Sequence, residues 1–352
     1  MDNLLSNRKF HLKGCSVLYR EAVSKWQYPT AIAFRYANFI FSGMDGYSAV
    51  PMPTTGITWP LFSASFGIFS LIAISLFLSV INHGVSEQLM GDMIRVTEEF
   101  FNMSKEDKAA YYSEDTSKTN RLFSSSDLSK KDGPRYWRDC LRLACYPVPE
   151  TINDWPDKPA KLREVLAKFI VEARDVSITL LSLISEGLGL KEGYFEGDLS
   201  SGQVMLNANY YPPCPAPDLT LGLLPHCDFN LITLLLQGAV SGLEIMHQGK
   251  WIRVDPIQNA LVINFGHQLE IITNGVLKSV EHRAVTNSGA ARTSLAVFIM
   301  PAKESFISPA KEIVNEENPP LYKSFVYKDF LRIYIELLAK RVDVMEAFKI
   351  NG

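Results

Sequence analysis

The chain has 352 residues and a formal net charge of −3, and hydrophobic residues make up 47% of it. So much apolar side chain can bury a sizeable core, which excludes disorder over most of the chain. The small net charge gives no general basic field, so we expect no nucleic-acid partner. The five cysteines form no CxxC pair. That argues against a disulfide scaffold or a zinc knuckle and favours a reducing compartment.

Residues 1–75 show no clean periodic pattern, and the chain has no Asp, Glu, Lys or Arg between residues 46 and 86. As a helix, residues 61–81 would be about 31 Å long, near the ~30 Å hydrocarbon core of a bilayer. A membrane span is one interpretation of this run. The other is a buried strand or helix. Serines dilute the run and it starts too deep for a signal peptide, which weakens the first interpretation. Both interpretations stay open at this point.

Amphipathic patterns follow from residue 86 onward. Ser86 is a good helix N-cap and precedes apolar residues at helical spacing. Residues 104–135 are polar and serine-rich, which predicts a loop, and part of it (113–133) could act as a substrate lid. Residues 160–189 predict a second helix that ends in glycines, and residues 321–342 return to a helical pattern.

Short apolar runs bounded by Pro, Gly and Asn occupy the part of the chain between these two helices. They predict strands at residues 204–211, 231–237, 242–246, 250–255, 260–265, 270–274, 282–285 and 294–300. Strands at this spacing, with turns between them, predict an antiparallel sandwich or a double-sheet barrel. The expected fold class is therefore α+β with a mainly β core and flanking helices.

His226 and Asp228 lie two residues apart at what we expect to be the start of an apolar strand. Because strand side chains alternate between faces, both should point to the same side. They supply two ligands of a facial metal triad, and His282, in another predicted strand, is the candidate third. This set leaves one side of an octahedral ion open, which suits ferrous iron that binds an organic co-substrate together with O2. An HxD pair alone also occurs by chance, so the argument depends on the whole arrangement.

Arg292 and Ser294 repeat the two-residue spacing. A guanidinium can hold a carboxylate by two charge-assisted hydrogen bonds, and a nearby hydroxyl can add a third. The intervening TNSGAA predicts a tight turn, which would place Arg292 on the strand beside His282. Asn209 and Tyr211 could add polar contacts to a dicarboxylate held between the metal and the arginine.

The order HxD…H…RxS and its surroundings resemble the plant 2-oxoglutarate- and iron(II)-dependent dioxygenases over roughly residues 77–348. The resembling texts are VINHGVS, YWRDCLRL, NYYPPCP, LPHCDFNLITLLLQ, GLEIMHQGKWIRVDP, ALVINFG, ITNGVLKSVEHRAV and RTSLAVFIMP. The tail PAKEIVNEENPPLYKSFVYKDFLRIYI looks closest to hyoscyamine 6-hydroxylase-like members. The resemblance implies a double-stranded β-helix (jelly-roll) domain at 201–305. An atypical segment (1–75) and a mainly helical region (76–200) would precede it, and a helical region (306–352) would follow.

The resemblance further implies that the three ligands named above bind Fe(II) and act in catalysis. It assigns the distal carboxylate of 2-oxoglutarate to Arg292 and Ser294, with Tyr211 and Asn209 in support. The implied reaction converts 2-oxoglutarate and O2 to succinate and CO2, with ascorbate as reductant. At the same time it hydroxylates or desaturates a small specialised metabolite such as an alkaloid or a phenolic. The resemblance also places Phe298 against the substrate, and Tyr136 of YWRD is a candidate at the mouth of the site.

Two features depart from the family pattern. Gly266-His267 stands where members usually have Gly-Asp, and we expect His267 to support the site from behind or to lie on the surface. Residues 1–75 also lack the short strand and helix that usually open the fold, and the match starts directly in the apolar run. The resemblance therefore favours the interpretation in which residues 76–81 form the end of a buried core strand. Two alternatives therefore remain: a catalytically impaired small-molecule-binding homologue, and a protein anchored to a membrane through residues 61–81. The favoured expectation is a cytoplasmic, monomeric enzyme.

Overall fold

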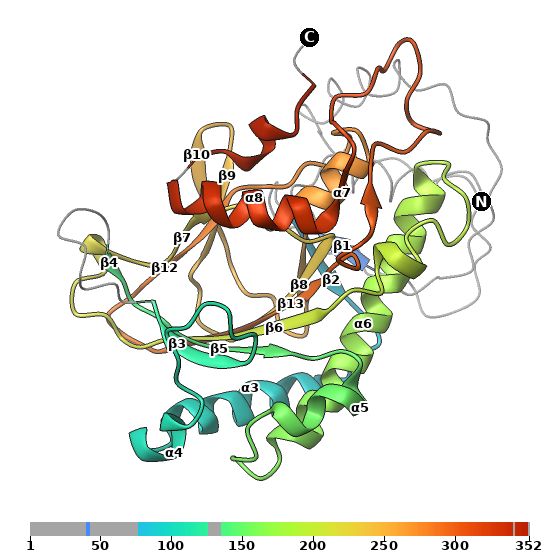
Figure 1. Cartoon of the computed structure of the whole chain (residues 1–352). Helices are drawn as coiled ribbons and strands as arrows, with labels where there is room; N and C mark the ends of the chain where they lie inside the picture. The colour runs from blue at the N-terminus through green and yellow to red at the C-terminus, as the bar shows by residue number, and fades with distance from the viewer. Residues whose placement is uncertain (1–39, 43–76, 126–134, 341, 351–352) are drawn as a thin grey trace, which may run out of the picture.

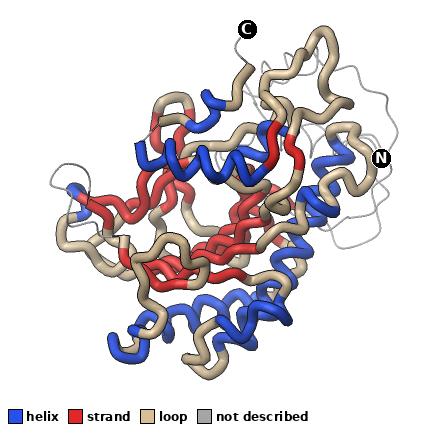
Figure 2. Tube along the Cα trace, viewed as in Figure 1, coloured by secondary structure: helices blue, strands red, loops and turns tan. Residues whose placement is uncertain are grey.

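The computed structural model describes residues 40–42, 77–125, 135–340 and 342–350 (Figure 1). Most of the apolar segment 61–81 and much of the suggested lid at 113–133 lie outside the described residues. Two β-sheets form the centre of the molecule, and helices flank them (Figure 2). No helix in the described ranges is long and apolar enough to cross a membrane.

The larger sheet has eight strands in the order β1-β2-β11-β8-β13-β6-β5-β3. In that order they are β1 (Ile40–Ser42), β2 (Leu78–Ile81), β11 (Leu261–Phe265), β8 (Ile232–Gln237), β13 (Arg292–Ile299), β6 (Val204–Tyr211), β5 (Asp139–Ala144) and β3 (Arg121–Ser124). All neighbouring strands in this sheet are antiparallel.

The smaller sheet has five strands in the order β10-β9-β12-β7-β4. They are β10 (Lys250–Val254), β9 (Leu243–His247), β12 (His282–Val285), β7 (Thr220–His226) and β4 (Arg135–Tyr136), and a separate pair consists of β14 (Phe306–Ile307) and β15 (Phe325–Val326). From β6 to β13 the chain passes repeatedly between the two large sheets. This is the double-stranded β-helix that the sequence resemblance implied.

The described part of the chain has six α-helices. They are α3 (Glu87–Asn102), α4 (Lys105–Ala109), α5 (Val148–Thr151), α6 (Leu162–Gly187), α7 (His267–Ile272) and α8 (Tyr327–Lys340), with short 3-10 turns η1 (Ile152–Asp154), η2 (Gly197–Leu199), η3 (Pro217–Leu219) and η4 (Val344–Ala347). Ser86 caps α3 as expected, because its hydroxyl accepts a hydrogen bond from the Leu89 N–H at 3.1 Å. α3 and α6 pack on each other and against β13.

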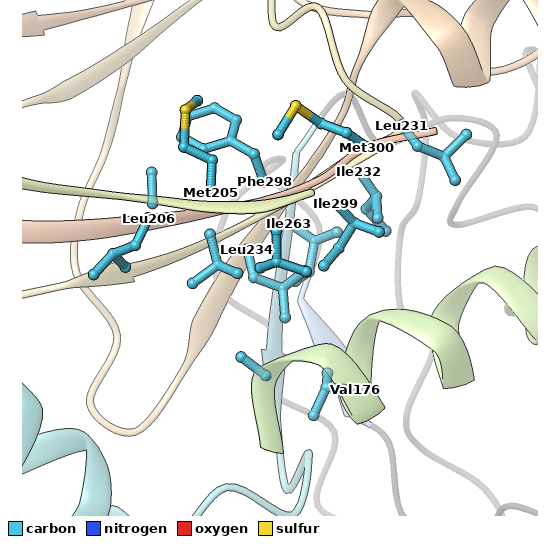
Figure 3. Packing of buried hydrophobic residues seen from close by; sticks show 14 of the residues in the cluster. Val176, Met205, Leu206, Leu231, Ile232, Leu234, Ile263, Phe298, Ile299 and Met300 are labelled. Carbon is cyan, nitrogen blue, oxygen red and sulfur yellow. The ribbon is translucent and has the colours of Figure 1, made fainter. Parts of the chain in front are cut away.

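The main core lies between the larger sheet and these two helices. Figure 3 shows Leu206 and Leu234 on the side of the strands toward Val176 of α6, whereas Met205 and Phe298 project from the opposite side. Leu206 and Leu234 are almost completely buried. This alternation along each strand separates a packed outer face from an inner face that looks toward the smaller sheet.

The N-terminal part of the described chain confirms one expectation and corrects another. Residues 78–81 form β2, whose Leu78 and Val80 are buried in the core, so the end of the apolar run is a strand as we favoured. The sequence did not predict β1, which pairs antiparallel with β2. Its three residues give too short a pattern for a period to be recognised.

Three other predictions about local structure were wrong. Residues 270–274 do not form a strand, because α7 occupies residues 267–272 and all six of its side chains are buried. In so short a segment whose helical side chains are all buried, no apolar period separates helix from strand. Within the predicted loop 104–135, α4 and β3 are regular elements. The C-terminal helix also begins later than residue 321, at Tyr327.

Candidate active site

The three predicted metal ligands come together at one end of the smaller sheet. His226 is the last residue of β7, Asp228 lies just beyond it, and His282 opens β12 as the direct partner of His226. The pair therefore follows a strand and does not begin one, contrary to the sequence prediction. Asp228 Oδ1 lies 3.6 Å from His226 Nε2 and 3.8 Å from His282 Nε2. Three such ligand atoms lie within 4.8 Å of one another, which is close enough to share an ion.

Backbone carbonyls orient both imidazoles. The Nδ1 atom of His226 lies 2.8 Å from the carbonyl oxygen of Leu224, and that of His282 lies 3.0 Å from the carbonyl oxygen of Val280. Because a carbonyl can only accept, each Nδ1 carries the proton and each Nε2 keeps its lone pair toward Asp228. Both rings thus offer the atom that a metal ion needs.

The carboxylate of Asp228 is fixed by two residues that sequence reasoning missed. Thr233 Oγ1 and Asn264 Nδ2 both donate to Oδ2 of Asp228, each at 2.6 Å, which leaves Oδ1 directed at the histidines. The only sequence signal was a polar residue inside each of two apolar strands, LITLLLQ and ALVINF. A polar residue in an apolar strand indicates a site only when it is known which strands are neighbours. Here β11 and β8 are neighbours, and Asn264 lies directly opposite Thr233.

The electrostatics of the three side chains suit a divalent cation. Burial, followed by the charge of His282, lowers the pKa of His226 to about 4. Burial alone would raise the pKa of Asp228, but the two histidines and the two hydrogen-bond donors outweigh it and lower that pKa. Near neutral pH the site therefore presents a neutral imidazole beside a carboxylate, as metal binding requires. Two imidazoles and one carboxylate, with other positions open, fit non-haem iron.

A buried guanidinium faces this centre from the opposite sheet. Arg292 opens β13 and is 2% exposed, and its Cζ lies 5.1 Å from the ring centroid of Tyr211. It donates to Ser294 Oγ and to Gln237 Oε1, both at 3.2 Å, and Gln237 was not predicted. Its Nε has no hydrogen-bond partner among the described residues, and no described carboxylate pairs with it. The side chain is thus placed to receive an anion.

The path from β12 to β13 differs from the expected tight hairpin. β12 belongs to the smaller sheet and β13 to the larger one, where β13 lies between β6 and β8. Residues 286–291 therefore carry the chain across to the facing sheet. Arg292 lies opposite the metal ligands and not on the strand beside them, so a molecule bound to both would bridge the two sheets.

Two glycines make room for the anion-binding side chains. A Cβ atom at Gly242 would lie 2.7 Å from Cδ of Arg292 and 3.1 Å from the carbonyl oxygen of Val285. A Cβ atom at Gly222 would lie 2.6 Å from the ring of Tyr211. Both contacts are too close for any side chain, so the positions of the guanidinium and the tyrosine ring depend on glycine at these two sites.

The other sequence candidates lie on the same inner face or near it. Asn209 is the direct partner of Ser294, but its amide is engaged by Arg138 Nη1 at 3.1 Å. Phe298 projects from the inner face (Figure 3). Its ring stacks on that of Phe229, with ring centroids 6.2 Å apart. Tyr136 pairs with Leu221 near the start of β7, whereas the ligand His226 ends that strand.

His267 lies directly behind the metal ligands and not on the surface. It is 5% exposed, and its backbone N–H donates to the carbonyl oxygen of Asp228 at 2.8 Å. Its ring packs edge-on against Tyr334 and Phe330 of α8, with centroids about 6 Å away. The residue thus helps to hold the loop that carries Asp228, in agreement with one of the two roles that we expected.

Sequence comparison indicates the same class of protein as the fold and the three metal-ligand side chains do, a non-haem iron enzyme. A family model described as the 2OG-Fe(II) oxygenase superfamily matches residues 202–301, and one described as the non-haem dioxygenase in morphine synthesis N-terminal matches residues 77–158. The 2'-deoxymugineic-acid 2'-dioxygenase of Hordeum vulgare is 58% identical, over 73% of this chain and 76% of that protein. The hyoscyamine 6-dioxygenase of Hyoscyamus niger is 42% identical, over 77% and 82% respectively.

A solved structure supports the same conclusion. The crystal structure of JOX2 in complex with 2OG, Fe and JA matches with a TM-score of 0.70 and 34% identity, over 76% of this chain and 80% of that one. The chain therefore belongs to the 2-oxoglutarate- and iron(II)-dependent oxygenase superfamily. It is a dioxygenase that uses Fe(II), 2-oxoglutarate and O2 to oxidise a small molecule, and ascorbate is the typical reductant for the family.

Proposed function

We propose that His226, Asp228 and His282 hold the iron, and that Arg292 anchors 2-oxoglutarate. The observation that carries this proposal is that two buried groups face each other. One sheet carries three side chains that can share a metal ion, and the other carries a guanidinium that has no carboxylate partner among the described residues. A dicarboxylate is charged at both ends, so it can bind the metal with one end and the guanidinium with the other.

The residues of the chain position and enclose the reactants. When bound, iron supplies the oxidising chemistry that couples conversion of 2-oxoglutarate to succinate and CO2 with oxidation of a C–H bond. Thr233 and Asn264 hold Asp228 in place for metal binding. Ser294 and Tyr211 support the guanidinium of Arg292, and Asn209 links this anchor to Arg138 on the same inner face. The ring of Phe298 would form part of the wall against the substrate, with Tyr136 nearer the entrance.

The substrate that we propose is a small specialised metabolite that is hydroxylated at one carbon or desaturated between two adjacent atoms. The relatives' names span several chemical classes. Hyoscyamine 6-dioxygenase is named for an alkaloid, whereas two barley relatives at 58% and 51% identity are named for 2'-deoxymugineic acid and mugineic acid. The candidates are therefore alkaloids, phenolics and carboxylic acids of the mugineic-acid type. We further propose that the enzyme is a cytosolic monomer, which fits the four free cysteines of the described chain.

Formation of succinate from 2-oxoglutarate tests this function. The protein, supplied with Fe(II) and ascorbate, is incubated with a panel of alkaloids, phenolics and mugineic acids, and products are identified by the mass of one added oxygen or two lost hydrogens. We expect Asp228→Ala to abolish both metal binding and turnover. Succinate formation no faster than in that variant, with every candidate, would contradict the proposal.

A second pair of variants tests the anchor. Arg292→Ala should raise the KM for 2-oxoglutarate by about 10- to 100-fold, because a hydrogen bond to a charged group contributes about 1.5–3 kcal/mol. Iron binding should be unchanged. Arg253→Ala is the matched control, because that side chain is 63% exposed and lies in β10. An unchanged KM in Arg292→Ala would show that the carboxylate binds elsewhere.

A further inference from the structure

A cluster of three arginines surrounds one aromatic ring on the inner face of the larger sheet. The Cζ atoms of Arg121, Arg142 and Arg138 lie 4.1, 5.4 and 5.9 Å from the ring centroid of Phe123. Arg121 of β3 is the direct partner of Arg142 of β5, which in turn faces Asn207 of β6. Residues that are directly opposite point to the same face of a sheet, so the cluster is continuous with the face that carries the 2-oxoglutarate anchor.

The positive charges of this arginine cluster are not neutralised by the described chain. No described carboxylate forms an ion pair with any of its three members. Their hydrogen bonds go instead to neutral oxygens: Arg142 Nε donates to Asn207 Oδ1 at 3.1 Å, and Arg121 Nη1 donates to the carbonyl oxygen of Ser113 at 3.2 Å. Arg138 donates to Ser125 and Asn209. Each guanidinium keeps N–H groups free, since arginine has five donors.

Burial makes this concentration of charge costly. Arg121 is 7% exposed, and its buried Nε has no hydrogen-bond partner among the described residues. Burial lowers the pKa of Arg142, and the charges of Arg121 and Arg138 lower it further. Like charges held together without a counter-ion cost free energy, which the contacts with Phe123 and with neutral oxygens offset in part. An anion bound by the cluster would add a charge-assisted contact that the described residues do not supply.

The arginine cluster lies beside the anchor strand β13, on the same inner face of the larger sheet. Arg138 binds Asn209, the direct partner of Ser294, so one hydrogen bond separates the cluster from the anchor strand β13. The residue before Arg138 is Trp137, whose backbone N–H donates to the carbonyl oxygen of Leu221 at 2.9 Å, and Leu221 lies in β7, the strand that ends at His226. A molecule bound between the cluster and the ligand His226 would therefore present its carbon skeleton to the metal.

We propose that Arg121, Arg138 and Arg142 form the subsite that binds a carboxylate group of the primary substrate, so that the enzyme oxidises an organic acid. This inference rests on the proposed function and adds to it the chemical class of the substrate. Arg142 and Arg138 are partly exposed, so a carboxylate can reach both, while the more buried Arg121 reinforces the positive potential. Phe123 supplies an apolar surface beside the charges. A cationic alkaloid would be repelled from this face.

Charge fractionation of a plant metabolite extract tests the substrate class. The extract is separated by ion exchange into anionic, neutral and cationic fractions, and each is incubated with the Fe(II)-loaded enzyme, 2-oxoglutarate and ascorbate. We expect a product heavier by one oxygen, or lighter by two hydrogens, in the anionic fraction alone. Methyl esterification of that fraction should abolish the product. A product that arises only from the neutral or cationic fraction would overturn this inference and leave the proposed function intact.

Two variants then locate the subsite. Arg142→Gln should raise the concentration of the anionic fraction that gives half-maximal product by at least ~10-fold, because it removes a charged hydrogen-bond donor. Arg142→Lys should recover part of that loss, and Arg253→Gln is the exposed control. Thermal unfolding confirms that each variant is folded. If Arg142→Gln instead weakens 2-oxoglutarate binding as strongly as Arg292→Gln does, the cluster binds the co-substrate and the inference fails. Absence of 2-oxoglutarate consumption with every fraction would overturn the proposed function as well.

Discussion

The imidazole rings of His226 and His282 lie 4.3 Å apart, because the two residues are direct partners across β7 and β12. Two protonated rings so close would repel each other. Backbone carbonyls hold both Nδ1 protons, and the shared neighbour Asp228 offers one free oxygen. A divalent cation among the three side chains relieves the remaining electrostatic cost.

Thr233→Val should weaken metal binding without removing a ligand. The substitution conserves volume but deletes one of the two hydrogen bonds that fix Oδ2 of Asp228. Loss of such a supporting contact typically weakens metal affinity by about 10- to 100-fold. The measurement is titration of the protein with Fe(II) under anaerobic conditions. Thr233→Ser should restore most of the affinity, and equal affinity in the Val and Ser variants would contradict the assigned role.

Gly242→Ala should impair binding of 2-oxoglutarate and leave iron binding unchanged. The new Cβ atom would lie 2.7 Å from Cδ of Arg292 and would displace the guanidinium. We expect the KM for 2-oxoglutarate to rise by about 10-fold or more, on the argument that a charge-assisted contact is lost. The control is Gly91→Ala, where a Cβ atom meets no other atom within 4 Å. If the KM for 2-oxoglutarate is the same in both variants, the position of Arg292 does not depend on the absence of a side chain at residue 242.

The metal-free protein should lose stability as the pH falls from 7 to 5. Burial first, then His282, lowers the pKa of His226 to about 4, and burial also lowers the pKa of His83 and His267. Below about pH 6.5 the unfolded chain binds protons that the folded chain does not, so the free energy of unfolding decreases. His226 alone contributes on the order of 2 kcal/mol by pH 5. Urea unfolding at pH 7 and pH 5 measures the change in the free energy of unfolding. This change should be smaller in His226→Gln. A free energy of unfolding that does not depend on pH would refute the prediction.

Gly91→Ala should stabilise the protein. Gly91 is exposed in the interior of α3, and nothing lies within 4 Å of its added Cβ atom. Alanine in place of glycine inside a helix raises the free energy of unfolding by about 0.5–1 kcal/mol, because less backbone entropy is lost on folding. Urea denaturation is the measurement. A destabilised variant would mean that α3 is not helical at this position.

The resemblance and the local spacing of residues were enough to predict much of the site. His226, Asp228 and His282 are brought together as expected, and Arg292 and Ser294 share one face of a strand. The N-cap at Ser86 and the long helix that ends at Gly187 were also readable, since capping residues and helical periodicity act over a few residues. The two-residue spacings, the N-cap and the helix depend on neighbours in the sequence, so the sequence alone determined them. The assignment of His282 as the third ligand came from the resemblance, because that residue joins the pair through strand pairing.

Only the tertiary structure decided which distant residues complete the site. Thr233 and Asn264 reach Asp228 because β8 and β11 are neighbours, and Arg121 meets Arg142 because β3 pairs with β5. The expected hairpin between residues 285 and 292 was wrong for the same reason: strand pairing places β12 and β13 in different sheets. Pairing between distant strands is set by the packing of whole faces against one another, and no short stretch of sequence carries that information.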